Sequence, residues 1–302
     1  MKLGFVSAIF PDWNLDEVLR FAAEEKFDCV EVMCWPPGKA TRKYGGVCHI
    51  DCSDLSQAQA DDINALAAKY GVSISGLGYY PNILSADAEE GEVAKAHLRK
   101  VIDAAKLLGL KNVNTFIGAN HEKDVEYNFA QFQKVWPELI RYTEQRDIYL
   151  AIENCPMLFS QHEWPGGKNL AHSPAIWRRM FAEIPSKHFG LNFDPSHFIL
   201  LMMDYVQPMY EFKDKLFHTH AKDMRIDRHV LNQVGRLALN WATPKIPGLG
   251  DGNWNAWISA LTDVGYQGAI CVEVEDEAFC HTIEDRKRSL RISRNVLRPL
   301  IA

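Results

Sequence analysis

The 302-residue sequence has no excess of basic residues, no CxxC cysteine pair and no long apolar run. It contains 33 lysines and arginines against 39 aspartates and glutamates, so it lacks the basic surface typical of nucleic-acid-binding proteins. No apolar stretch is long enough to span a bilayer, and the opening run MKLGFVSAIF is soon interrupted by Pro11 and Asp12. We therefore expect a first strand rather than a signal peptide, and a protein that binds neither nucleic acid nor membrane.

Cysteine and glycine patterns exclude two further classes. The seven cysteines are scattered, and Cys29, Cys34 and Cys271 lie in apolar, strand-like runs, which predicts reduced, buried thiols in a cytoplasmic protein. No glycine-rich dinucleotide fingerprint follows an early strand. The run GLGDG at 248–252 follows no predicted strand, so we do not expect a phosphate loop or a nucleotide cofactor.

Apolar, β-rich runs alternate with helical patterns along the whole chain. The strand-like runs are 2–10, 28–35, 72–80, 112–118, 148–155, 189–194, 216–223 and 269–276. The helical patterns are 14–26, which Asn14 would cap, 92–109, 128–146 with a bend at Pro137, 174–184, 204–215, 254–265 and 284–301. Eight strand–helix units in one chain predict an α/β fold, a (β/α)8 TIM barrel forming a single domain over residues 1–302. An open, doubly wound sheet is the alternative.

Three long segments follow predicted strands, at 36–56, 156–173 and 224–253. In a barrel these would stand at the C-terminal ends of the strands, where active sites are found. Long loops there commonly cover the site.

The run LFHTHAKD at 216–223 places His218, His220 and Lys222 at alternate positions, hence on one face of a strand. The same alternation puts aliphatic residues outward and polar residues inward on three neighbouring predicted strands. The inward residues near the strand ends are Glu153, Asp194, His220 and Glu273.

Converging buried carboxylates repel one another unless a positive group lies between them. A divalent cation would resolve the repulsion, and three oxygen ligands with one imidazole favour Mn²⁺, Mg²⁺ or Co²⁺ over structural Zn²⁺. The alternative is internal pairing, in which Lys222 neutralises Glu153 or Glu273 and His218 is a hydrogen-bonded core histidine. Four residues at equivalent strand positions favour the metal site.

Other side chains at the same end of the barrel are candidate substrate contacts. In NFDPSHF, Pro195 ends the strand and is expected to place His197 on a loop above the barrel, although it could instead cap a helix. Arg225 follows the seventh strand and could bind a hydroxyl or a phosphate, or simply be a surface arginine. Aromatic residues suited to the faces of a sugar gather at these strand ends, namely Phe10, Trp13, Trp35, Tyr79, Tyr80, Phe116, Trp164 and Phe198.

These motifs resemble a known family. IENC, NFDPSH, HAKD and VEVED at the ends of the fifth to eighth strands, with PGLGDGNWNAW before the eighth, are similar to the xylose-isomerase-like TIM barrels, also called AP endonuclease family 2 or the sugar phosphate isomerase/epimerase family. The resemblance extends over essentially the whole chain. It is specific for the family and not for a substrate.

The resemblance implies roles for the matching residues. Glu153 and Glu273 would bind the metal and act as the acid/base pair, while Asp194 and His220 would complete the metal ligands. It also implies substrate contacts by His197 and Arg225. Lys222, Trp13, Trp35 and Tyr79 are further candidate substrate contacts from their positions at the strand ends. The segments after the fifth and seventh strands depart from the epimerase pattern, which leaves the substrate less defined than the chemistry.

The expected activity is that of a metal-dependent isomerase or epimerase of a ketose or related keto sugar. A proton would be abstracted next to a metal-bound carbonyl, giving an enediolate, with Mn²⁺ as the expected ion and Mg²⁺ or Co²⁺ as alternatives. A lyase or dehydratase acting on a keto-inositol or 3-oxo-glycoside shares the first step and is the main alternative. An endonuclease IV-like phosphodiesterase would need more ligands and a basic face. We expect a small-molecule sugar as the ligand and allow for a homo-oligomer.

Overall fold

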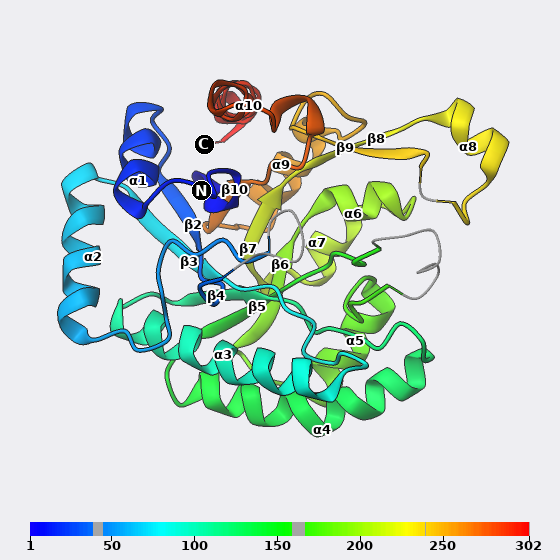
Figure 1. Cartoon of the computed structure of the whole chain (residues 1–302). Helices are drawn as coiled ribbons and strands as arrows, with labels where there is room; N and C mark the ends of the chain where they lie inside the picture. Colours follow the sequence, from blue (N-terminus) through cyan, green and yellow to red (C-terminus); the bar gives the residue numbers. More distant parts are fainter. Residues whose placement is uncertain (39–44, 159–166, 239, 302) are drawn as a thin grey trace.

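The computed structural model describes residues 1–38, 45–158, 167–238 and 240–301. Within them, parallel strands close into an eight-stranded barrel in the order β1-β10-β7-β6-β5-β4-β3-β2 (Figure 1). The strands are β1 (Lys2–Val6), β2 (Cys29–Met33), β3 (Ser73–Gly78), β4 (Asn112–Thr115), β5 (Tyr149–Glu153), β6 (Phe189–Phe193), β7 (Leu216–Ala221) and β10 (Ala269–Val272). Because β1 pairs with both β2 and β10, the sheet has no free edge, and the predicted TIM barrel is confirmed.

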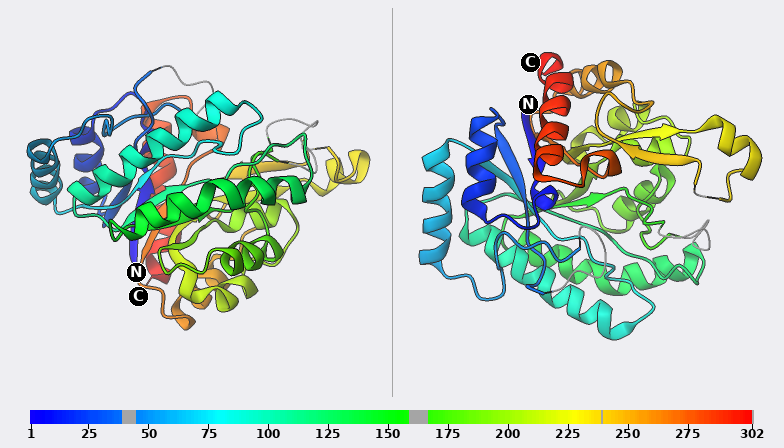
Figure 2. Two further views of the ribbon diagram at one scale, coloured as in Figure 1. Left: turned by 90° about the horizontal axis from the view of Figure 1, so that it is seen from below. Right: turned by 45° about the horizontal axis from the view of Figure 1, so that its top comes forward.

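Helices surround the barrel (Figures 1 and 2). They are α1 (Leu15–Glu24), α2 (Gln57–Tyr70), α3 (Ala88–Leu107), α4 (Val125–Glu144), α5 (Pro174–Glu183), α6 (Pro195–Leu200), α7 (Gln207–Glu211), α9 (Trp254–Asp263) and α10 (Ile283–Leu297). The predicted cap of α1 is confirmed, since the Asn14 side chain accepts from the Glu17 amide at 3.0 Å and Glu17 accepts from the Asn14 amide at 2.8 Å. Helix α4 runs through Pro137.

Helix α2 was not among the helices expected from the sequence. It starts at a capping box in which the Ser56 side chain accepts from the Gln59 amide. Its buried residues are only Ala60 and Ala67, so the apolar stripe that would have revealed it is weak. The helix supplies the crossover between β2 and β3.

The segment 224–253, expected to be a loop, forms an arm. Strands β8 (Asp223–Ile226) and β9 (Ala242–Lys245) pair antiparallel, and α8 (Arg228–Val234) lies between them. The arm projects from the barrel beside β7 and α6 (Figure 2). Pro244 of β9 contributes to the wall of the pocket described below.

Apolar side chains fill the layer between strands and helices, while polar side chains occupy the barrel interior. Leu150, Ile152 and Leu191 are completely buried beneath the helices. Inside the barrel, Glu31 and His220 are also completely buried. Over the described part of the chain, no helix combines the length and apolarity needed to cross a membrane. Charged side chains are thus buried inside the barrel. Because burying an unpaired charge is costly, these side chains need partners.

Candidate active site

Four of the predicted residues meet at the C-terminal ends of the barrel strands. Glu153 ends β5, Asp194 follows β6, His220 lies in β7, and Glu273 follows β10. Each offers a ligand atom, and these four atoms all lie within 4.8 Å of one another. The alternation of side chains along four strands thus produces a compact cluster of three carboxylates and one imidazole.

Two asparagines hold the carboxylate-bearing strand ends in place. The Asn154 side chain accepts from the Asp194 amide at 2.7 Å and donates to the Asp194 carbonyl at 2.9 Å. The Asn169 side chain donates to the carbonyls of Glu153 and Cys155, at 2.9 and 2.7 Å. These bonds fix the backbone below Glu153 and Asp194, so the positions of both carboxylates depend little on side-chain freedom.

His220 is oriented by a carboxylate that the sequence interpretation missed. Its Nε2 lies 2.6 Å from Oε2 of Glu31, and since a carboxylate can only accept, Nε2 carries the donated proton. Its Nδ1 faces Oε2 of Glu153 at 3.8 Å and Oε2 of Glu273 at 3.6 Å. A carboxylate behind an imidazole is the arrangement that orients histidine metal ligands. The signal for Glu31 was a carboxylate between two valines within the apolar run DCVEVMCW.

Below this pair, a hydrogen-bonded network fills the barrel. The Tyr80 hydroxyl donates to Glu31, and Asn192 donates to the Tyr80 hydroxyl at 3.1 Å. His218 Nδ1 lies 3.1 Å from Oδ1 of Asn192, and its Nε2 lies 3.0 Å from the Ser75 hydroxyl. Burial, partly opposed by the charge of Glu31, lowers the pKa of His218 to about 4. His218 is therefore a neutral core histidine, as the alternative interpretation of LFHTHAKD proposed.

Lys222 places a positive charge beside the cluster. Its Nζ lies 2.5 Å from Oε2 of Glu273 and 3.2 Å from both Oδ2 of Asp194 and Oε2 of Glu275. The internal pairing considered for Lys222 is thus present in part, with Glu273 rather than with Glu153. One ammonium faces three carboxylates here, so Lys222 alone does not neutralise them.

The cations around the cluster keep its two glutamates ionised. Burial raises the pKa of Glu153, but hydrogen bonds from His197 and His220 outweigh it, and the pKa is lowered. For Glu273, burial is likewise outweighed, chiefly by the charge of Lys222, and the pKa is lowered to about 2. Burial lowers the pKa of His220, yet the charges of Glu31 and Glu273 raise it overall. Each group is held in its charged form by its neighbours.

The cluster suits a divalent cation better than the other two groups that could hold one. Glu31, His218 and His220 form a second group, but hydrogen bonds to Tyr80, Asn192 and Ser75 already engage it. Glu153, Cys155 and His197 form a third, with a single carboxylate. In the four-residue cluster, Oδ2 of Asp194 and Nδ1 of His220 are buried without a hydrogen-bond partner among the described residues. A bound ion would satisfy both atoms, in place of the proton on Nδ1 and of the Lys222 and His197 side chains near Oδ2.

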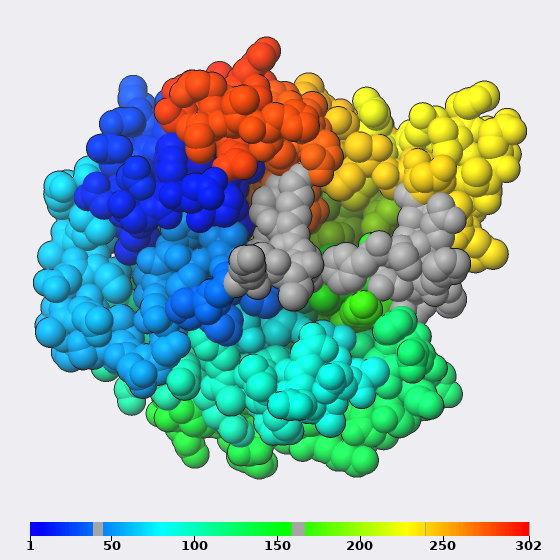
Figure 3. Space-filling view, viewed as in Figure 1, coloured from blue at the N-terminus to red at the C-terminus, as the bar shows by residue number. Residues whose placement is uncertain are grey.

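The cluster opens into a hollow of about 330 Å³, which we call the reaction hollow. Glu153, Lys222 and Glu273 line it, together with Glu275 and Pro244. Apolar and aromatic residues form the remaining wall, among them Val6, Ala8, Met33, Trp35, Tyr80, Phe116 and Met157. Figure 3 shows the surrounding face of the molecule, with α3 in cyan, α10 in red and the β8–β9 arm in yellow. A few polar groups converging in an otherwise apolar hollow are typical of small-molecule sites.

The structure does not bring every predicted contact residue to this hollow. His197 lies in α6 rather than on a loop, is buried, and places Nε2 3.1 Å from Oε1 of Glu153. Arg225 is exposed on β8, because its position in the hairpin points it away from the barrel. Trp13 stacks on Phe10 with ring centroids 4.0 Å apart, since the chain turns into α1 there.

The other aromatic residues divide among several places. Trp35, Tyr80 and Phe116 line the reaction hollow, whereas Tyr79 lines a neighbouring one. Phe198 packs on Trp177 beneath α6. Trp164 lies outside the described residues.

Comparison with known proteins agrees with this geometry. A family model described as xylose isomerase-like TIM barrel matches residues 19–300. The uncharacterized protein YfiH of Bacillus subtilis (strain 168) is 25% identical over 308 residues, covering 91% of this chain and 93% of that protein. The IOLI protein, solved with a bound zinc atom, superposes with a TM-score of 0.74 at 17% identity, covering 100% of both chains. D-psicose 3-epimerase, solved in the presence of D-fructose, superposes with a TM-score of 0.71 at 16% identity, covering 98% of this chain and 99% of that one.

The chain belongs to the family of xylose isomerase-like TIM barrels. This confirms the resemblance drawn from the strand-end motifs. The structural likeness, at these identities, shows the shared fold.

Proposed function

We propose that the protein is a divalent-metal-dependent isomerase or epimerase acting on a ketose or a related keto sugar. The observation that carries the proposal is the convergence of Glu153, Asp194, His220 and Glu273 beside the reaction hollow, with two of their ligand atoms lacking a hydrogen-bond partner among the described residues. The description of one structural neighbour as a D-psicose 3-epimerase supports the same class of reaction.

Glu153, Asp194, His220 through Nδ1, and Glu273 would hold the ion, with Glu31 fixing the imidazole. The donor set favours Mn²⁺, with Mg²⁺ and Co²⁺ as alternatives, and the zinc atom in IOLI is a reason to include Zn²⁺ in the tests. When bound, such an ion would supply Lewis-acid chemistry, making the hydrogen on the carbon beside a substrate carbonyl more acidic.

Glu153 and Glu273 would perform the proton transfer. Their strands, β5 and β10, are separated in the barrel by β6 and β7, so the two carboxylates approach the hollow from different sides. Both have lowered pKa values and are ionised at neutral pH, so either can accept a proton. For epimerisation with Glu153 as the base, the Lys222 ammonium, 2.5 Å from Glu273, would pass a proton to Glu273, which would deliver it to the opposite face of the carbon. Glu153 would then release the proton it took, and Lys222 would regain one from solvent. Delivery of a proton to the neighbouring carbon instead would be isomerisation.

The walls of the hollow would position a sugar and limit water. Trp35 and Phe116 offer apolar surfaces, which suit the C–H faces of a sugar ring. Lys222 lies beside Glu273 and also lines the hollow, so it can hold that carboxylate ionised and donate to a substrate oxygen. His197 bonds to Glu153 and would act by positioning it.

The test is solvent exchange. The protein is incubated in D₂O with Mn²⁺, Mg²⁺, Co²⁺ or Zn²⁺ and a panel of keto sugars, keto-inositols and 3-oxo-glycosides, and the recovered compounds are examined by NMR. We expect deuterium at a carbon beside the carbonyl of at least one ketose or keto sugar, with an epimer or isomer as the product. Loss of water from the substrate would indicate the lyase alternative instead. Absence of exchange with every compound and every ion would contradict the proposal.

A further inference from the structure

A second, larger hollow of about 910 Å³ adjoins the reaction hollow, and we call it the outer hollow. Trp35 and Met157 line both, so the two spaces adjoin at these shared side chains. The acid/base pair does not line the outer hollow among the described residues. A molecule whose reacting part lies at Glu153 and Glu273 could therefore extend past Trp35 into the outer space.

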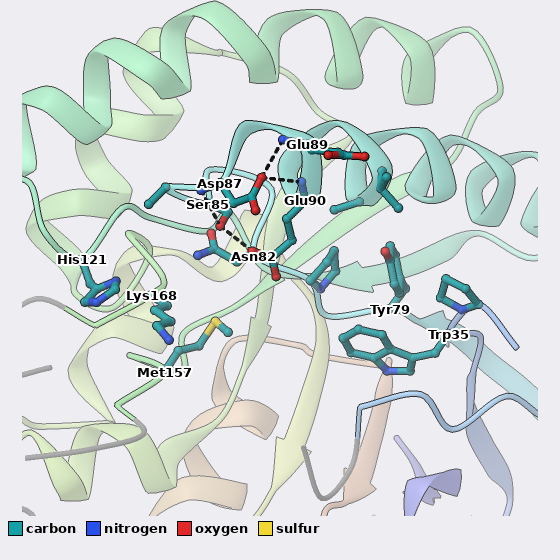
Figure 4. Close-up of a pocket in the computed structure, with 15 residues that line it drawn as sticks. Trp35, Tyr79, Asn82, Ser85, Asp87, Glu89, Glu90, His121, Met157 and Lys168 are labelled. Carbon is teal, nitrogen blue, oxygen red and sulfur yellow. Dashed lines mark hydrogen bonds between the residues drawn. The ribbon is translucent and has the colours of Figure 1, made fainter. Parts of the chain in front are cut away.

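One wall of the outer hollow is a supported aromatic platform. Trp35 packs edge-on against Tyr79, with ring centroids 5.0 Å apart, and Tyr79 packs against His97 at 4.7 Å. His97 Nε2 is in turn bonded to the Cys34 carbonyl at 2.8 Å. In Figure 4, Trp35 and Tyr79 stand on one side of the hollow and His121 and Lys168 on the other. The packing fixes both aromatic rings, which suits binding of a flat apolar face such as that of a sugar ring.

The rest of the lining mixes polar and apolar residues, and it includes three carboxylates. Asp87, Glu89 and Glu90 line the hollow where α3 begins (Figure 4). Oδ1 of Asp87 caps the helix by accepting from the amides of Glu89 and Glu90, at 2.9 and 3.2 Å, and the Ser85 hydroxyl donates to Glu90 at 2.5 Å. The carboxylates of Asp87 and Glu90 are thereby held in place as hydrogen-bond acceptors. Acceptors suit a ligand with many hydroxyl groups, and the three carboxylates outnumber the lysine that lines the hollow, Lys168, which disfavours a phosphate.

We propose that the outer hollow binds a second, neutral sugar ring, so that the substrate is a glycosylated keto sugar rather than a free monosaccharide or a sugar phosphate. The reacting keto sugar would occupy the reaction hollow, and its glycosyl substituent would lie between Trp35 and the carboxylates of α3. The inference rests on the proposed function for the identity of the reacting unit. It adds the substrate class, which the acid/base cluster alone does not define.

The test measures binding, with fructose as the reference ligand. Turanose, maltulose, lactulose and isomaltulose each carry a glycosyl ring on a different hydroxyl of fructose or in a different configuration. Dissociation constants are measured by saturation-transfer NMR on the protein with saturating Mg²⁺, and fructose 6-phosphate is included. We expect at least one disaccharide to bind about tenfold more tightly than fructose, with transfer to its glycosyl ring. No tighter binding by any of them, or tightest binding by the phosphate, would overturn the inference.

A matched pair of substitutions locates the second ring. Val93 of α3 lines the outer hollow and is 60% exposed, whereas Val125, which begins α4, is 44% exposed and lies outside both hollows. In V93W the ratio of disaccharide affinity to fructose affinity should fall until the two ligands bind about equally well. V125W should leave the ratio unchanged. An unchanged ratio in V93W would contradict the assignment.

The two proposals can fail separately. Deuterium exchange into fructose without any preference for disaccharides would overturn the outer site and leave the proposed reaction standing. A V93W-sensitive preference without exchange in any compound would overturn the reaction and support the sugar site.

Discussion

Asp223 and Asp194 are both completely buried near the same end of the barrel, yet their surroundings differ in kind. Asp223 accepts hydrogen bonds from five neutral donors: the amides of Met224, Gly248, Gly250 and Gly252 and the indole of Trp254, at 2.8 to 3.2 Å. A side chain at Gly250 would place Cβ 2.3 Å from Oδ1 of Asp223, so glycine is required for this approach. The run GLGDG wraps a carboxylate of the chain itself.

Only one of the two carboxylate oxygens of Asp194 accepts a hydrogen bond from a backbone amide. Oδ1 accepts from the Ser196 amide at 2.8 Å and caps α6. Oδ2 has no hydrogen-bond partner among the described residues, and it faces Nζ of Lys222 at 3.2 Å and Nε2 of His197 at 3.3 Å. Further carboxylates, of Glu153 and Glu273, lie beside it.

Under the proposed function, the difference separates a structural carboxylate, Asp223, from one that would bind the ion, Asp194. Backbone amides cannot move away or change charge, so Asp223 is committed to holding the segment before α9 against the barrel. The groups around Asp194 are side chains that can titrate or shift, which leaves room for an ion or a substrate oxygen. The four predictions below test this contrast, from the largest expected effect to the smallest.

Removing either glutamate charge should have the largest effect. Glu153→Gln and Glu273→Gln each remove a proton acceptor and a ligand, so we expect deuterium exchange to fall by about 10²–10⁴-fold while the protein stays folded. Exchange rates and circular dichroism check this. Glu275→Gln is the control, since Glu275 lines the same hollow and pairs with Lys222 but lies outside the four-residue cluster. A larger loss in this control than in the other two variants would contradict the assignment.

Asp223→Asn and Asp194→Asn should separate stability from ion binding. An amide at position 223 cannot satisfy five donors, so we expect the free energy of unfolding to fall by about 2–4 kcal/mol. Asparagine at position 194 keeps the cap of α6 and relieves charge repulsion, so stability should change by less than about 1 kcal/mol while ion affinity falls. Urea denaturation and metal titration measure the two effects. If the two substitutions lowered the free energy of unfolding equally, the proposed difference between Asp223 and Asp194 would be contradicted.

Ion affinity should rise with pH. Burial opposes protonation of His220, but the charges of Glu31 and Glu273 raise its pKa, so without an ion Nδ1 carries a proton at neutral pH. Binding at Nδ1 must release that proton, so affinity should increase by about tenfold per unit between about pH 6 and pH 8. Calorimetry in buffers of different ionisation enthalpy counts the protons released. Glu31→Gln removes one source of the raised pKa and should flatten the dependence; a flat profile in the unsubstituted protein would argue against His220 as a ligand.

Arg225→Ala should have the smallest effect. Arg225 is exposed on β8 and does not line the reaction hollow, so we expect exchange rates to change by less than about twofold. A loss of about tenfold or more would mean that the arm folds over the hollow during turnover, bringing Arg225 to the substrate as first predicted.

The barrel and its cluster could be predicted because strand alternation is a short-range rule. Once LFHTHAKD is a parallel strand, His220 must point inward, and the same parity brings Glu153, Asp194 and Glu273 to the same end. Glu31 obeys the same rule in DCVEVMCW, so it could have been found by extending the parity argument to β2.

Residues beyond the strand ends could not be placed in this way. The positions of Trp13 and Arg225 depend on how the chain turns after β1 and β7, and no periodicity encodes that. Helix α2 escaped notice because alanines form its buried face, and the β8–β9 hairpin because β9 contains Pro244 within the sequence ATPK. The outer hollow is formed by the segments that follow β2, β3, β4 and β5 and by the first part of α3, and it follows only from their packing.

The most direct test of the central claim is an anomalous diffraction map from crystals soaked in Mn²⁺. The account predicts a single strong peak bounded by Glu153, Asp194, Nδ1 of His220 and Glu273, with the Lys222 ammonium displaced from its place between Asp194 and Glu273. A peak between Glu31 and His218, or no peak with Lys222 still bridging those carboxylates, would contradict it.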